Sequence, residues 1–190
     1  MKTKIITIIF CSIAYLCNAQ TSSTIKRKAN VDFDAYEKLI PEVKAHRKGR
    51  LVDLPTFLKI AEEKGTIILD TRSDSLFKRK HVKGAIHLNF SDFTQQNLLR
   101  IIPNADTKIL IYCNNNFIDD QANFASKIVV PVLIKKKIAP ISLALNIPTY
   151  INLYGYGYRN VYELSELVST RDKRITFEGT ETRSTIVKAR

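Results

Sequence analysis

Short apolar runs alternate along the chain with segments whose apolar residues recur at helical spacing. Short uninterrupted apolar runs are typical of buried parallel strands. The predicted strands are 50–52, 66–69, 85–88, 108–112 and 160–164. Strands that alternate with helices at this spacing indicate βαβ units. We therefore expect an α/β fold: a single domain with a mainly parallel central sheet and helices on both faces.

The helical segments carry recognisable start and stop signals. The predicted helices are 32–48, 53–65, 91–101 and 148–154. Asp53 is expected to cap the second helix, with Pro55 in its first turn and Gly65 at its end. Ser91 is expected to cap the third helix. Pro41 marks a point at which the first helix can split, and the charged segment 72–80 is predicted to be a loop.

The chain begins with the layout of an export signal. Met1–Lys4 is basic, Ile5–Leu16 is almost continuously apolar, and Cys17–Ala19 supplies small or polar residues before Gln20. This apolar stretch is short for a membrane span, so we expect cleavage after residue 19 and a periplasmic or secreted protein without stable membrane insertion. An uncleaved N-terminal anchor is the alternative.

The net charge and the cysteine content limit which partners and reactions the chain can support. The 190-residue chain has a formal charge of +12, which falls to +10 when residues 1–19 are removed with Lys2 and Lys4. Scattered basic residues on an exported protein favour small anions over nucleic acid as partners. Cleavage also removes Cys11 and Cys17, so Cys113 remains alone and cannot form an internal disulfide. This thiol is either buried and inert or used in chemistry.

Two chemistry-bearing residues follow predicted strands. Asp70 comes directly after the strand 66–69, and Cys113 directly after the strand 108–112. Ligand sites of open parallel sheets gather beyond the carboxyl ends of the strands. Because three asparagines follow Cys113, we expect its thiol to be exposed in a loop at this edge, close to Asp70.

Four ordered motifs carry a family resemblance. They are Leu69–Ser73 (LDTRS), His81–Leu88 (HVKGAIHL), Ile109–Cys113 (ILIYC) and Gly157–Leu164 (GYRNVYEL). In order and approximate spacing they resemble the signatures of rhodanese-homology domains over about residues 50–165. The Cys113-Asn-Asn-Asn sequence and the long segment after it resemble a variant group of exported bacterial members with an insertion after the active-site cysteine.

This resemblance implies a sulfurtransferase. Cys113 would take a sulfur atom from a small anionic donor as a persulfide and pass it to a thiol or cyanide. The loop residues Asn114, Asn115, Asn116 and Phe117 would cradle the anion with backbone N–H groups. The asparagines also suit turns, because asparagine tolerates left-handed backbone geometry.

Supporting residues are expected around the cysteine. The resemblance implies that Asp70 and Arg72 form a pair that ties the edge together, and His81 is expected to order its loop by hydrogen bonding. The histidines lack partners at metal-ligand spacing, so we predict no metal and no cofactor. The run that contains Lys78, Arg79, Lys80 and Lys83 is typical of a solvated surface; beside Cys113 it would also attract anions.

The sequence departs from the family pattern after Cys113. No arginine follows in the next several positions, which argues against a phosphatase loop, because that loop grips phosphate with a bidentate arginine. The next helix is predicted only from about 148, so residues 118–147 are read as an insert, hairpin-like over 127–145. A non-catalytic rhodanese-homology module that binds a protein partner through 127–145, or an anionic ligand, is therefore the alternative to an enzyme.

The predicted organisation follows from these segments. It comprises an export signal at 1–19, a flexible tail at 20–31, a rhodanese-like domain at 32–170 with its insert at 118–147, and a C-terminal extension at 171–190. The extension is expected either to add one short strand or to dock on the surface of the domain.

Overall fold

The fold is described from a computed structural model, which describes residues 29–118, 120 and 144–182. The chain divides into two compact units, residues 1–32 and 33–190. The described part of the first unit, residues 29–32, contains no helix or strand. The predicted signal and most of the predicted tail and insert lie outside the described residues. Everything below concerns the second unit.

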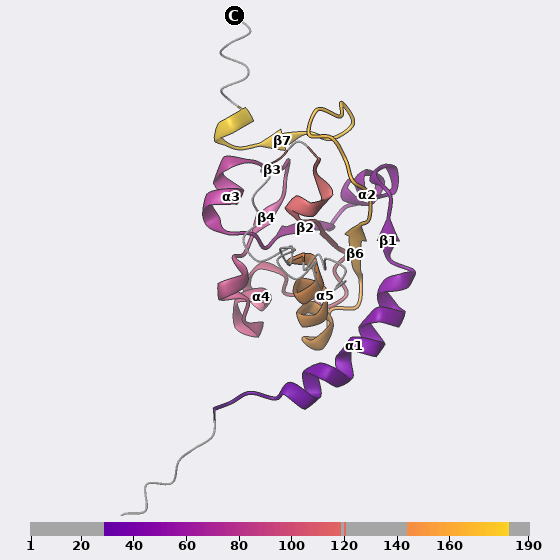
Figure 1. Ribbon diagram of the computed structural model, residues 1–190, viewed down its shortest axis with the longest axis vertical. Helices are drawn as coiled ribbons and strands as arrows, with labels where there is room; N and C mark the ends of the chain where they lie inside the picture. The colour runs from indigo at the N-terminus through magenta and orange to yellow at the C-terminus, as the bar shows by residue number, and fades with distance from the viewer. Residues whose placement is uncertain (1–28, 119, 121–143, 183–190) are drawn as a thin grey trace, which may run out of the picture. The chain divides into compact units, whose positions relative to one another are not determined.

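A five-stranded parallel sheet forms the centre of the second unit (Figure 1). Its strands lie in the order β1-β6-β5-β2-β4. Their bounds are Leu51–Val52 (β1), Ile67–Asp70 (β2), Ile86–His87 (β4), Ile109–Ile111 (β5) and Val161–Leu164 (β6). A separate antiparallel pair joins His81–Val82 (β3) to Phe177–Glu178 (β7). The predicted fold class, including its mainly parallel sheet, is confirmed.

Helices cover both faces of the sheet, as predicted. Their bounds are Phe33–Lys48 (α1), Leu54–Ala61 (α2), Asp74–Arg79 (α3), Gln95–Ile101 (α4) and Asn146–Gly155 (α5), with short 3-10 helices at Phe90–Asp92 (η1) and Asn114–Asn116 (η2). Residues of α1, α4 and α5 pack into one buried cluster, and residues of α2 into another, against which the partly buried Phe77 of α3 packs. Figure 1 shows the two groups of helices on opposite sides of the strands.

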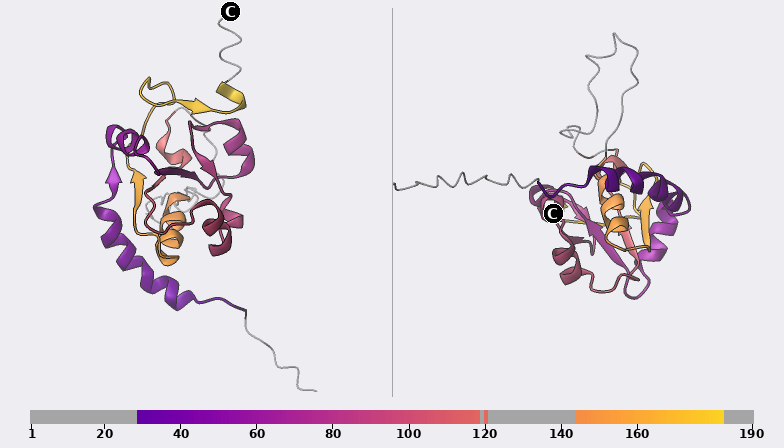
Figure 2. Two further views of the ribbon diagram at one scale, coloured as in Figure 1. Left: turned by 180° about the vertical axis from the view of Figure 1, so that it is seen from behind. Right: turned by 90° about the horizontal axis from the view of Figure 1, so that it is seen from below.

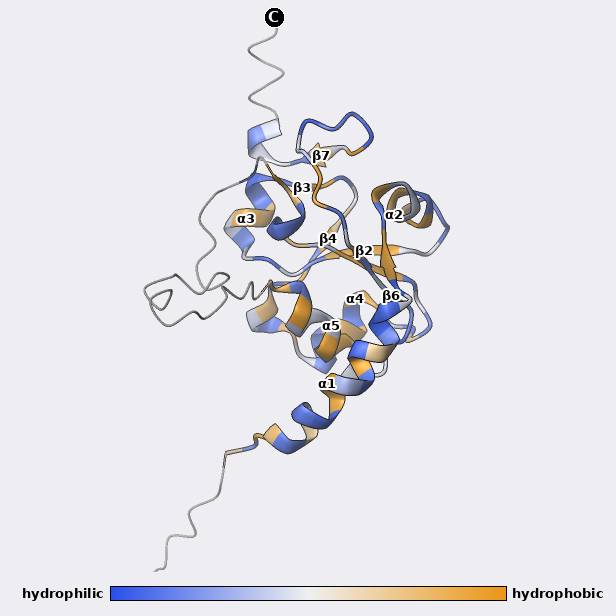
Figure 3. Ribbon diagram, turned by 45° about the vertical axis from the view of Figure 1, so that its right-hand side comes forward, coloured by the Kyte–Doolittle hydropathy of each residue, from blue (hydrophilic) through white to orange (hydrophobic). Residues whose placement is uncertain are grey.

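Alternation along the strands explains the two clusters. Ile109 and Ile111 of β5 join the cluster with α5, whereas Leu110 between them joins the cluster with α2. Because successive strand side chains point to opposite faces, an all-apolar strand supplies two cores at once. Figure 3 shows β2 and β6 as largely hydrophobic, whereas the helices carry both colours.

The predicted helix boundaries are partly confirmed. Asp53 caps α2, and its Oδ1 accepts the N–H of Thr56 at 2.9 Å. However, α2 ends at Ala61, and Gly65 (φ 83°) lies beyond it in the turn before β2. Helix α1 runs through Pro41 without a break. Pro41 and Glu37 are both exposed, so water can bind the carbonyl that the missing proline N–H leaves free.

Two predictions about local structure were wrong. The charged segment 72–80, predicted as a loop, contains α3, with Asp74 in its first turn and two basic residues in its last turn. Charges in that order complement the helix dipole. The helix predicted to begin at Ser91 begins at Gln95, because Thr94 Oγ1 accepts the N–H of Asn97 at 3.1 Å.

The C-terminal extension contributes one strand, which was one of the two alternatives expected for it. Strand β7 pairs with β3, and Val82 stands opposite Phe177. Figure 2, seen from behind, shows the yellow C-terminal segment running along this end of the unit. Among the described residues, no helix has both the length and the apolar character needed to cross a membrane.

The contact between α1 and α5 predicts a pH dependence. His46 Nδ1 lies 3.0 Å from the Tyr150 hydroxyl, and its ring packs edge-on against Tyr154. Burial lowers the pKa of His46, and the charges of Arg50 and Arg159 lower it further. The unfolded chain therefore takes up a proton at a higher pH than the folded protein. The free energy of unfolding should fall as the pH drops below about 6.5.

This dependence can be measured by denaturant unfolding between pH 5 and pH 7.5. His46→Gln should flatten the slope over this range, because glutamine does not titrate. The assignment to His46 is wrong if the parent protein and the variant lose stability in parallel as the pH falls.

Candidate functional site

The predicted residues meet at the carboxyl edge of β2 and β5. These strands are neighbours, and Leu69 stands opposite Ile111. Asp70 is therefore level with Tyr112, and Cys113 is the next residue beyond the edge. The sequence prediction that Asp70 and Cys113 share one edge of the sheet is confirmed.

A buried ion pair between Asp70 and Arg72 forms the centre of this edge. The two residues are 0% and 2% exposed. Arg72 Nε donates to Asp70 Oδ1 and Oδ2 at 2.9 and 3.0 Å, and Nη2 donates to Oδ2 at 2.6 Å. The backbone N–H of Arg72 also donates to Oδ1. This fork-like geometry fixes both side chains, which form the pair expected from the sequence.

Tyr112 is the third member of the buried network. Its hydroxyl donates to Asp70 Oδ2 at 2.5 Å and accepts the N–H of Val82 at 3.0 Å. The Arg72 guanidinium lies over its ring, 5.3 Å from the centroid. Burial raises the pKa of Tyr112 well above its usual value, and the charge of Asp70 raises it further. The phenol therefore stays neutral and ties β5 to β2 and β3.

Arg72 also reaches the turn that follows Cys113. Nη1 donates to Asn114 Oδ1, and Nη2 donates to the Lys80 carbonyl at 2.7 Å. Burial lowers the pKa of Arg72, but the hydrogen bonds and charge of Asp70 outweigh this effect and raise the pKa above its ordinary value. The guanidinium therefore holds a permanent positive charge between the carboxylate and the turn.

The Cys113 thiol is buried, and the prediction that it is exposed was wrong. The residue is 0% exposed and forms no disulfide in the described part of the chain. Its side chain lies at the N-terminus of η2, where the backbone N–H of Asn116 donates to the Cys113 carbonyl at 2.9 Å and Asn116 Oδ1 accepts the N–H of Cys113 at 2.9 Å. The Asn116 amide hydrogen therefore has a carbonyl partner, and solvent does not reach the thiol.

Asn116 explains why the turn closes over the thiol. Its Nδ2 donates to the carbonyls of Leu164 and Glu166 at 2.8 and 3.1 Å. Val168 forms two backbone hydrogen bonds with the same turn. Its N–H donates to the Asn116 carbonyl at 2.7 Å, and its carbonyl accepts the N–H of Ile118 at 3.0 Å. The asparagine side chain thus satisfies buried polar groups and does not face water.

The other predicted loop residues also lie inward. Asn114 is 1% exposed, and its Nδ2 has no hydrogen-bond partner in the described part of the chain. Asn115 is partly exposed. Phe117 is buried and packs edge-on against Tyr112 and Phe177. The asparagines form a turn, which was one of their two sequence interpretations. Whether the turn also cradles an anion stays a prediction.

His81 orders its own segment, as expected. Its Nδ1 lies 2.7 Å from the Phe77 carbonyl, and its ring stacks on Phe77 with 3.8 Å between centroids. The residue opens β3, and the next residue, Val82, is the one that contacts Tyr112. His81 therefore acts on the edge indirectly. The described residues contain no cluster of three or more histidine, cysteine or acidic side chains that could hold a metal ion.

Part of the basic run lies beside the network. Asp120 Oδ1 accepts from Arg79 Nη2 at 3.3 Å and from Lys80 Nζ at 3.5 Å, and Asp120 Oδ2 lies 4.0 Å from Arg72 Nη1. Glu181 pairs with the same two basic residues. The side chain of Asp120 is only 4% exposed. Arg79 and Lys80 are thus neutralised within the fold, whereas the sequence suggested a solvated run.

Sequence reasoning missed Tyr112, Asp120 and a contact from α5. In the sequence, Tyr112 looks like one more apolar residue of the strand. A tyrosine hydroxyl that is buried in a core needs a hydrogen-bond partner, and this requirement was the signal that could have identified Tyr112 as part of the network. Thr149 Oγ1 lies 2.8 Å from Thr71 Oγ1, so α5 contacts the same edge although the two threonines are 78 residues apart in sequence. No local pattern marks this long-range pair.

A family model described as Rhodanese-like domain matches residues 53–166. No curated protein matches the chain. Among solved structures, the BH2092 protein from Bacillus halodurans is 18% identical, with 78% of this chain and 86% of that chain covered and a TM-score of 0.44. The Alr3790 protein from Anabaena sp. is 17% identical, with 73% and 89% covered and a TM-score of 0.43. A rhodanese with anions from E. coli is 14% identical, with 60% and 99% covered and a TM-score of 0.37.

Proposed function

Because the chain belongs to the rhodanese-like domain family, whose model spans residues 53–166, we propose that it is an exported sulfurtransferase with Cys113 as its nucleophile. Family membership supports a chemistry of the sulfurtransferase type. The substrates would be a small anionic sulfur donor and a thiol or cyanide acceptor. The apolar stretch at 5–16 supports export to the periplasm or beyond.

One observation carries the assignment to Cys113. The residue lies just beyond the carboxyl end of β5, where parallel sheets place their ligand sites, and it begins the turn that contains η2. Residues 20–190 contain no other cysteine. The mature protein therefore has one sulfur nucleophile, and it stands where the fold supports chemistry.

The proposed reaction has two balanced displacements. The Cys113 thiolate attacks the outer sulfur of thiosulfate; an S–S bond forms to the protein as the S–S bond of thiosulfate breaks, and sulfite leaves with the bonding pair. The resulting persulfide anion then loses its outer sulfur to cyanide, which gives thiocyanate and restores the thiolate. Each step conserves charge and needs no further oxidant or reductant.

The surrounding residues would shape this site. Asp70 holds the Arg72 guanidinium, and Arg72 in turn donates a hydrogen bond to the side-chain oxygen of Asn114. The Asn114 Nδ2 group, which has no partner among the described residues, would then donate to an anion next to the sulfur. A donor reaches Cys113 only when the turn 113–118 opens, since the thiol is 0% exposed.

Mass spectrometry of the mature protein tests the proposal directly. Incubation with thiosulfate, polysulfide or a low-molecular-weight persulfide should add the mass of one sulfur atom, and cyanide should remove it with release of thiocyanate. Cys113→Ser is the matched control and should show neither change. A parent protein that never gains sulfur from any of these donors would contradict the enzyme assignment.

The full burial of Cys113 favours a second candidate, a non-catalytic module. In this hypothesis the thiol is a core residue, and a protein or an anionic ligand binds through the insert, over 127–145. The segment 127–143 lies outside the described residues. A cellular phenotype that survives Cys113→Ser but not deletion of 127–145 would favour this function.

Export has its own test. N-terminal sequencing of the protein recovered from the periplasm or medium should begin at Gln20. Recovery of the intact N-terminus with the cell membrane would indicate the uncleaved anchor.

A further inference from the structure

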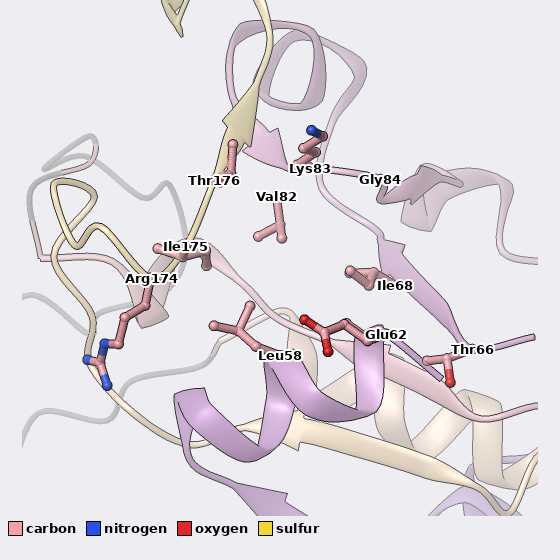
Figure 4. A pocket seen from close by; sticks show the side chains of 11 residues that line it. Leu58, Glu62, Thr66, Ile68, Val82, Lys83, Gly84, Arg174, Ile175 and Thr176 are labelled. Atoms are coloured by element: carbon pink, nitrogen blue, oxygen red, sulfur yellow. The ribbon is translucent and has the colours of Figure 1, made fainter. Parts of the chain in front are cut away.

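The described part of the fold contains a pocket that Cys113 does not line. Its volume is about 570 Å³, within the usual range for small-molecule sites. Helix α2, the start of β2, the segment around β3 and residues 174–176 surround it (Figure 4). The apolar side chains that face it are Leu58, Ile68, Val82 and Ile175.

The C-terminal extension completes this pocket. The carbonyl of Thr176 accepts the N–H of Lys83 at 2.8 Å, which seats residues 174–176 against β3. These residues lie beyond the family match, which ends at residue 166. The pocket is thus built from the domain and from a segment outside the family match.

Glu62 is the charged group that faces the pocket. Figure 4 shows its carboxylate extended from α2 over the apolar side chains, whereas the charged ends of Lys83 and Arg174 point away. Arg174 forms an ion pair with Asp172, and its Nη2 and Nε lie 2.6 and 3.0 Å from the carboxylate oxygens. Among the described residues, Glu62 forms no ion pair. Its carboxylate is therefore available to a ligand.

The Glu62 carboxylate suits an ammonium group, which has three donors and no acceptor. Thr66 also lines the pocket, but its Oγ1 is a buried atom that a ligand in the pocket does not reach. The floor of the pocket is apolar, so the remainder of a suitable ligand is apolar as well.

We propose that this pocket binds a small organic cation, a primary ammonium group carried on an apolar body about the size of one aromatic ring. The ammonium group pairs with Glu62, and the body covers Leu58, Val82 and Ile175. This activity is separate from sulfur transfer. The net positive charge of the chain opposes cations only weakly at this pocket, because salt screens charges that lie more than about 8 Å away at physiological ionic strength.

Three probes of one shape test the charge preference. Benzylammonium, benzyl alcohol and benzoate are titrated into the purified protein at neutral pH and physiological salt, with binding followed by calorimetry and by NMR shifts of Val82 and Ile175. Benzylammonium should bind saturably and shift these signals. The alcohol and benzoate should each bind about tenfold more weakly, since a hydrogen bond to a charged group is worth about 1.5–3 kcal/mol.

Neighbouring glutamates provide a matched pair of variants. Glu62→Gln should weaken benzylammonium binding about tenfold, whereas Glu63→Gln should leave it unchanged, because the Glu63 carboxylate bonds to Lys108. Both side chains lie on the surface at the end of α2, so both variants should fold. Lack of saturable benzylammonium binding, equal binding of benzoate, or unchanged affinity in Glu62→Gln would each overturn the proposal. Sulfur transfer at Cys113 is measured separately and bears on none of these outcomes.

Discussion

Replacing Arg72 with methionine should lower the free energy of unfolding by about 3–5 kcal/mol, the usual cost of breaking a buried ion pair from one side. The variant would leave the Asp70 carboxylate, which is 0% exposed, with the Tyr112 hydroxyl as its main remaining side-chain donor. It would also leave the Lys80 carbonyl without its buried donor. Urea unfolding of parent and variant measures the difference.

Two further variants isolate the cause. Arg174→Met removes an exposed pair with Asp172 and should leave the free energy of unfolding almost unchanged, because solvent screens such a pair. Adding Asp70→Asn to Arg72→Met removes the stranded charge, so the double variant should be more stable than Arg72→Met alone. A loss below about 1 kcal/mol for Arg72→Met would show that water or a rearranged partner replaces the guanidinium.

The sheet was predictable because its signal is local. The β5 run Ile109–Ile111 is apolar at every position, and only a strand buried on both faces requires this. Asp70 and Cys113 stand at the ends of two parallel strands, so both could be predicted to lie at the carboxyl edge of the sheet. The segment 72–80 misled the prediction because α3 buries none of its residues, so it lacks the apolar stripe that marks a helix.

Burial of the site could not be predicted from residue type. Three successive asparagines suggest a solvated loop, but Asn116 is held inside by partners at Cys113, Leu164 and Glu166. Two of these partners lie almost fifty residues away in sequence and come close only after β6 joins β5. Tyr112 has the same character, because its hydroxyl partners, Asp70 and Val82, come from other strands.

Replacing Asn116 with alanine should speed alkylation of Cys113 by about thirtyfold or more. Iodoacetamide reaches the 0% exposed thiol only after the turn 113–118 opens. Asn116 contributes three side-chain hydrogen bonds to the closed turn, worth about 0.5–1.5 kcal/mol each. Their loss raises the open population, and the labelling rate follows that population when opening is faster than alkylation.

Asn160→Ala is the matched control, because Asn160 makes one exposed side-chain hydrogen bond at the amino end of β6, away from Cys113. Its labelling rate should equal that of the parent protein, and urea unfolding of each variant separates local opening from global loss of stability. A parent thiol that labels as fast as in the unfolded chain would show that the turn does not protect it.

If Asn116→Ala labels faster and also accepts sulfur from thiosulfate faster, opening of this turn limits access of the donor. If labelling rises while sulfur transfer falls, the turn must close again after the donor has entered, and the same three hydrogen bonds that bury Cys113 also prepare it for reaction.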